Sequence, residues 1–124
     1  MTDANALLAA ARRILTAAGR DLARGLDESA CVSAHRGAVL ATEAWLRRRG
    51  QVHVSNSVHE NVCLSPLAGL EVREAALKLD RHRVEEGYPH RSSQAGADPV
   101  AESREVVAAG RRVLRFVEEE LGSA

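Results

Sequence analysis

Residues 25–50 read GLDESACVSAHRGAVLATEAWLRRRG and decide the expected fold more than any other stretch of the chain. Small or apolar side chains recur there every three to four residues, which is the repeat of one face of an α-helix. They are Cys31, Ala34, Ala38, Ala41 and Trp45. Asp27 is expected to cap the start of this helix, and Gly50 to supply the left-handed residue after its end. Because small side chains let a neighbouring helix approach closely, the stretch predicts the central helix of a helical protein.

Two further long helices are expected towards the ends of the chain. The first begins after Asp3 as its N-cap, carries one apolar stripe and ends near Gly25. The last has Asp98 as its N-cap, Pro99 as its first residue and Gly122 at its end. Both have the spacing of amphipathic helices, so both are expected to pack one face against the central helix.

A short helix and a longer one are expected between them. Ser57 and Glu60 have the form of a capping box, which predicts a short helix over Val58–Leu64. Pro66 is then expected in the first turn of a longer helix that ends by Gly87. The stretch that follows is rich in Gly, Pro and Ser, which is typical of a loop.

Together these elements predict an all-α fold, an antiparallel up-and-down bundle of four to five helices that forms one domain over residues 1–124. The chain holds only three aromatic residues but 45% hydrophobic residues in all, and no long stretch alternates as a strand does. Gly110 stands inside the last expected helix, where glycine costs about 1 kcal/mol relative to alanine. Close packing at Gly110 is the expected compensation.

Charge and cysteine content exclude several classes of protein. The 17 Lys and Arg residues balance 17 Asp and Glu residues, which excludes a generally basic nucleic-acid binder but leaves room for a local basic groove. No run approaches the roughly 20 apolar residues of a membrane span, so no membrane association and a cytoplasmic location are expected. Cys31 and Cys63 are too few for a disulfide framework and are expected to be reduced.

Two stretches resemble a known family. The small-residue stretch 25–50, which ends in large apolar and basic residues and a glycine, resembles the second helix of HEPN domains (higher eukaryotes and prokaryotes nucleotide-binding). Residues 79–90, LDRHRVEEGYPH, are similar to the family's helix end with an Arg, a Tyr-Pro and a loop. A closing helix with Phe116 and Val117 near its end completes the resemblance, which implies an HEPN-like bundle over roughly residues 7–121.

The resemblance also implies a site. The family's motif is an Arg followed, after four to six residues, by a His, and Arg83 and His90 have this spacing. The implied activity is RNA cleavage without a metal ion or other cofactor. His90 would transfer protons, because histidine titrates near neutral pH, and Arg83 would bind the phosphate. Tyr88, Arg81 and Arg91 are the expected substrate-binding residues.

Partners follow from the same resemblance. HEPN domains generally form homodimers in which two motifs face one cleft, and some are the toxin of a toxin–antitoxin pair with a nucleotidyltransferase antitoxin. RNA would then be the substrate. The alternative is a non-catalytic HEPN-like module for dimerisation or for binding a nucleotide or partner protein. Val84 favours this alternative, because family members usually have a polar residue after the Arg. In the simplest alternative, Arg83 forms a surface ion pair and His90 is a solvated loop residue.

Three other residues invite a functional interpretation, and each has a structural one. His59 and Cys63 lie four residues apart on the expected short helix and could face one metal ion. Two ligands do not make a metal site, so no metal is expected and Cys63 is expected to be a buried apolar group. His35, beside the small-residue face of the central helix, is expected to be a hydrogen-bonded interface or core histidine.

Overall fold

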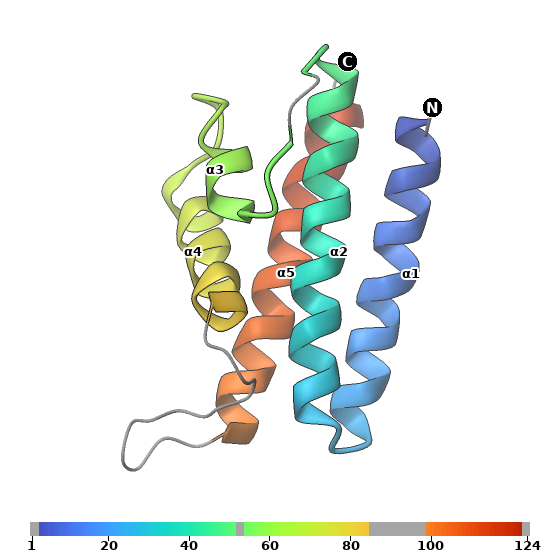
Figure 1. Cartoon of the computed structure of the whole chain (residues 1–124), viewed down its shortest axis with the longest axis vertical. Coiled ribbons are helices and arrows are strands. Elements are labelled where there is room, and N and C mark those ends of the chain that lie inside the picture. Colours follow the sequence, from blue (N-terminus) through green and yellow to red (C-terminus); the bar gives the residue numbers. More distant parts are fainter. Residues whose placement is uncertain (1–2, 52–53, 85–98, 123–124) are drawn as a thin grey trace.

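The computed structural model describes residues 3–51, 54–84 and 99–122, and all regular secondary structure within these ranges is helical. The helices are α1 (Ala4–Ala23), α2 (Asp27–Arg48), α3 (Val58–Val62), α4 (Leu70–Val84) and α5 (Pro99–Gly122). Helices α2 and α5 occupy the middle of the bundle, with α1 on one side and α3 and α4 on the other (Figure 1). Helices α1 and α4 run opposite to α2 and α5, which confirms the predicted antiparallel bundle.

The small-residue face of α2 forms the centre of the core, as predicted. Its alanines are fully buried, and Trp45 packs edge-on against Phe116 of α5 with ring centroids 5.1 Å apart. Gly110 of α5 lies against α2 so closely that a Cβ there would be 3.1 Å from the carbonyl oxygen of Ala34 and 2.9 Å from Leu15 Cδ2. The predicted close packing at Gly110 is therefore confirmed, because only a residue without a side chain fits between α1, α2 and α5.

Several helix ends agree with their sequence signals. The carboxylate of Asp3 accepts a hydrogen bond from the Asn5 N–H, as an N-cap does. Gly25 and Gly50 have φ values of 79° and 84°, in the left-handed region that favours glycine. After α2, the Gln51 N–H donates to the Leu46 carbonyl at 2.9 Å, which satisfies one of the last free carbonyls of the helix. Each of these ends was predictable because it depends on local hydrogen bonds.

Two predicted helix starts are wrong. Leu26, not Asp27, is the N-cap of α2, and no side chain caps this helix. Asp27 is the first helical residue, where its negative charge interacts favourably with the positive end of the helix dipole. Helix α4 begins at Leu70 rather than at Pro66. The buried hydroxyl of Ser65 accepts the Leu67 N–H at 3.0 Å, so this segment forms turns instead of a first helical turn.

The short helix α3 is present and shorter than predicted, since it ends at Val62 rather than Leu64. The Ser57 hydroxyl accepts the Glu60 N–H at 3.1 Å, which confirms the predicted N-terminal cap. Within the part of the chain that the structure describes, no helix has the length and apolar character needed to cross a membrane.

Candidate functional site

The residues predicted to form a nuclease site belong to the end of α4 and to the segment that follows it. Arg83 lies in the last turn of α4, and Arg81 is exposed on the same helix. His90, Tyr88 and Arg91 lie outside the described residues. The pairing of Arg83 with His90 therefore stays a prediction, whereas the anchoring of the helix that carries Arg83 can be described.

One turn before Arg83, the carboxylate of Asp80 joins α4 to the start of α3. Its Oδ2 accepts hydrogen bonds from the Ser57 hydroxyl at 2.7 Å and from the His59 N–H at 3.0 Å. Its Oδ1 accepts the Val58 N–H at 2.9 Å. Hydrogen bonds to a charged group contribute about 1.5–3 kcal/mol each. Asp80 therefore fixes α3 against α4 at the point where the predicted site begins.

His35 of α2 approaches the same carboxylate. Its Nε2 is 3.4 Å from Asp80 Oδ1, and the two side chains are only 12% and 13% exposed. The two atoms are close but do not form a well-aligned hydrogen bond, since the buried Nε2 has no hydrogen-bond partner by geometry. His35 therefore lies at the interface of α2 and α4, as predicted, but the hydrogen bond expected of it is not formed by Nε2. We call His35, Asp80, Ser57 and the N–H groups of Val58 and His59 the Asp80 cluster.

Two opposing effects determine the pKa of Asp80. Burial raises the pKa of this carboxyl group, because it removes water from the charged form. The contact with His35 and the hydrogen bonds from the N–H groups of α3 and from Ser57 favour the charged form, and together they outweigh burial. The pKa of Asp80 is lowered to about 2, so the carboxylate is ionised at neutral pH and acts as an acceptor, not as a proton donor.

A second buried polar group, the side-chain amide of Asn61, lies beside the Asp80 cluster, and its hydrogen-bonding atoms all have partners. The Asn61 side chain of α3 donates to the Thr42 hydroxyl at 3.1 Å and to the Ser55 carbonyl at 2.8 Å. Its oxygen accepts the Ser55 N–H at 3.0 Å, and Thr42 in turn donates to a carbonyl of its own helix. Because every group has a partner, Asn61 holds α3 on α2 and offers nothing to a ligand.

The two cysteines are free thiols, as predicted. Burial raises the pKa of the Cys31 thiol, which keeps it protonated and unreactive. Cys63 is exposed, so the prediction that it is buried is wrong: it follows the last turn of α3, on the solvent side. Its Sγ lies 3.3 Å from His59 Nε2. Among the residues described, no third His, Cys, Asp or Glu joins this pair to form a metal site.

Sequence reasoning did not assign a role to Asp80. A signal was present, because the first N–H groups of any helix need acceptors and the capping box of α3 supplies only one from Ser57. The identity of the remaining acceptor could not be read from the sequence, since Asp80 lies 21 to 23 residues away from the groups it binds.

Several solved structures of known proteins have the same fold as this chain. An archaeal HEPN homologue, ST0689, matches with a TM-score of 0.79 and 19% identity, over 97% of this chain and 98% of its own. An HEPN domain protein from Thermotoga maritima matches with a TM-score of 0.78 and 24% identity, over 95% and 98% of the two chains. The TT1696 protein from Thermus thermophilus matches with a TM-score of 0.78 and 29% identity, over 96% and 98%.

No protein-family model matches the sequence, and no curated protein matches it. The fold is nevertheless that of HEPN domains, because two structures of this kind align over nearly the whole chain. The fold implied by residues 25–50 and 79–90 is thereby confirmed.

Proposed function

From the HEPN fold of this chain, we propose that it is a metal-independent endoribonuclease that acts as a homodimer. The supporting observation is the position of Arg83, in the last turn of α4 and one turn beyond Asp80. The Asp80 cluster joins this end of α4 to α2 and α3. A phosphate-binding residue needs such rigid support, because errors of about 1 Å in position cost much of the rate.

In the proposed reaction, one residue stabilises the negative charge on the phosphate and another transfers protons. A base removes the proton of the 2′-hydroxyl, whose oxygen attacks the adjacent phosphorus. The bond to the 5′-oxygen breaks, and an acid returns a proton to that oxygen, which leaves a 2′,3′-cyclic phosphate and a 5′-hydroxyl. In this proposal His90 carries the protons, and Arg83 stabilises the negative charge on the phosphate oxygens.

A homodimer supplies what a single chain lacks. One histidine cannot be both base and acid at the same moment, whereas two copies of Arg83 and His90 facing one cleft provide both roles. Tyr88, Arg81 and Arg91 are proposed to bind the RNA around this cleft. The biological setting that fits such an enzyme is the toxin of a toxin–antitoxin pair, with a nucleotidyltransferase as antitoxin.

A second function is favoured by a separate observation, the exposed leucines on the α3–α4 side of the bundle. Their exposed fractions run from 44% to 72%, far above those of the core leucines. They are Leu64, Leu67, Leu70 and Leu77. Leu70 and Leu77 are two turns apart on α4 and so share one face of it, and a patch of exposed apolar side chains often marks a protein interface. The second proposal is therefore a non-catalytic module that dimerises or binds a partner protein through this side, and Val84 in place of a polar residue agrees with it.

One experiment separates the two proposals. Purified protein is incubated with a mixed RNA pool in the presence of EDTA, together with Arg83→Ala, His90→Ala and the control Arg13→Ala. Arg13 is an exposed arginine of α1, so its loss changes the charge equally and leaves α4 untouched. Cleavage that persists in EDTA and in Arg13→Ala but disappears in the other two variants supports the nuclease.

Absence of cleavage in every sample contradicts the nuclease proposal. Light scattering of Leu70→Glu and Leu77→Glu then tests the module. A dimer that dissociates in both variants supports a dimer interface on the α3–α4 side, and a dimer that persists in both variants contradicts one there.

A further inference from the structure

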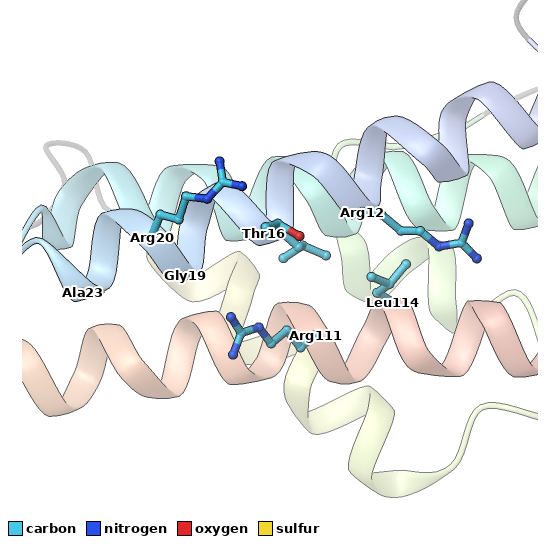
Figure 2. Close-up of a pocket in the computed structure, with 8 residues that line it drawn as sticks. Arg12, Thr16, Gly19, Arg20, Ala23, Arg111 and Leu114 are labelled. Carbon is cyan, nitrogen blue, oxygen red and sulfur yellow. The ribbon is translucent and has the colours of Figure 1, made fainter.

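A groove runs between α1 and α5, on the side of the bundle away from α4. Figure 2 shows it bordered by arginines from both helices. Its volume is about 590 Å³. Carbon atoms form much of its walls, from Leu114, Thr16 and Ala23, while the charged groups are Arg12, Arg20 and Arg111. We call this the α1–α5 groove. Its size falls within the range of about 300–1,000 Å³ typical of small-molecule sites.

The three arginines differ in what they bind. Arg12 forms a close ion pair with Glu118 of α5, with Nε 2.6 Å from the carboxylate. Arg20 and Arg111 form no ion pair with any described residue. The acid next to Arg20, Asp21, instead accepts a hydrogen bond from the Ser29 hydroxyl at 2.6 Å. Two positive charges in the groove are therefore without a protein counter-charge within the described part of the chain.

The position of Arg111 depends on a glycine. Its Nη2 lies against Gly19 of α1, in the place that a Cβ at residue 19 would occupy. Gly19 stands inside α1, where glycine costs about 1 kcal/mol relative to alanine. In return, the missing side chain leaves space for the guanidinium between the two helices (Figure 2). This differs from Gly110, where the helix backbones and a buried leucine fill the space.

We propose that the α1–α5 groove binds a small organic phosphate monoester. Arg111 would hold the phosphate group in the groove, and Arg20, an exposed side chain of α1 that points away from α5 in Figure 2, would turn towards it. Guanidinium groups suit this ligand, because their planar N–H pairs match two phosphate oxygens at once. The groove is much larger than a phosphate ion, so the organic part of the ligand would lie against the carbon atoms of Leu114, Thr16 and Ala23.

This site is independent of the proposed nuclease. Its arginines belong to α1 and α5, whereas Arg83 belongs to α4, and α1 and α4 lie on opposite sides of the bundle (Figure 1). A negative result for the nuclease proposal therefore does not contradict phosphate binding in the α1–α5 groove, and the reverse also holds.

The test measures binding of phenyl phosphate and inorganic phosphate to the full chain by calorimetry at one fixed ionic strength. Phenyl phosphate is expected to bind at least about threefold more tightly, since its ring adds contact with the apolar walls. Arg111→Ala and Arg20→Ala are each expected to weaken binding of phenyl phosphate about tenfold, the loss of a charge-assisted hydrogen bond. Arg13→Ala, an exposed arginine of α1 that does not line the groove, should bind as the wild type does.

Gly19→Ala provides an independent variant, because it displaces Arg111 and keeps every charge. It is expected to weaken binding severalfold without loss of folding, since the tip of a flexible side chain can move away. Equal weakening in Arg13→Ala and Arg111→Ala would overturn the proposal, because binding would then follow net charge only. It is also overturned if phenyl phosphate binds no better than inorganic phosphate, or if neither compound binds.

Discussion

The Asp80 cluster and the α1–α5 groove both place charged side chains between helices, but they differ in whether each charge has a partner. In the cluster, one carboxylate accepts three hydrogen bonds and lies 3.4 Å from a histidine. In the groove, Arg20 and Arg111 have no counter-charge among the described residues. The first arrangement uses its charge to hold helices together, whereas the second leaves charge available to a ligand.

The difference follows from what each region has to stabilise. Helix α3 has only five residues, and a helix so short does not persist in water by itself. It needs acceptors for its first N–H groups, and Asp80 supplies them. Helices α1 and α5 have 20 and 24 residues and pack along their apolar faces, so their stability does not depend on the arginines at the rim. The contrast predicts unequal effects of substitution in the two regions.

The largest expected effect is that of Asp80→Ala. The variant leaves the N–H groups of Val58 and His59 without acceptors and His35 without its carboxylate, so it should lower the free energy of unfolding by about 3 kcal/mol. Urea unfolding measures the change. Asp80→Asn keeps the shape and one acceptor and should lose less. Arg111→Ala, the counterpart in the groove, should change stability by no more than about 0.5 kcal/mol, and an equal loss in Arg111→Ala would contradict the comparison.

Acid should remove the contribution of the cluster specifically. The pKa of Asp80 is about 2 in the folded protein, below its ordinary value of 3.8, so its stabilising effect is complete above about pH 5 and is lost progressively as the pH falls to 2. At 1.36 kcal/mol for each unit of pKa, the loss is about 2 kcal/mol. Unfolding in urea at pH 6 and at pH 2.5 measures it. The expected control result is a smaller loss between these two pH values in Asp80→Asn, and an identical loss would show that other carboxyl groups are responsible.

Gly110→Ala should destabilise the protein although alanine favours a helix. A Cβ there would lie 3.1 Å from a backbone oxygen of α2, which cannot move without separating the helices. Such overpacking costs about 1–3 kcal/mol, against a gain of about 1 kcal/mol in helix propensity. The expected net loss is about 1 kcal/mol, measured as a lower midpoint of thermal unfolding. A raised midpoint would mean that α5 and α2 are not as close as described.

Gly19→Ala should have the smallest effect and the opposite sign. Its Cβ meets only the tip of Arg111, which can rotate into solvent, so the gain in helix propensity of up to about 1 kcal/mol should remain. The same thermal measurement should show a slightly raised midpoint. Destabilisation equal to that of Gly110→Ala would show that the Arg111 side chain is held in the groove by contacts with the protein itself.

The helices and their place in the bundle were largely predictable from the sequence. The small-residue repeat of α2, the Ser57 cap of α3 and Gly50 after α2 involve residues close together in the chain, and periodicity and local hydrogen bonds determine them. The same local reasoning was wrong at Pro66, because the competing hydrogen bond from the backbone to the Ser65 hydroxyl ended the predicted helical turn.

The sequence by itself therefore determined the all-α class, the central helix and the need for close packing at Gly110. The first two depend on local hydrophobic periodicity, and the third on a single glycine inside a helix. Only the tertiary structure decided which acceptor serves the start of α3, and that Arg20 and Arg111 have no ion-pair partner among the residues that the structure describes. Asp80 meets α2 and α3 from a distant part of the chain, and Arg111 meets Gly19 across two helices. Such contacts depend on how helices pack, because a side chain's partners are set by the relative placement of whole helices and not by its neighbours in sequence.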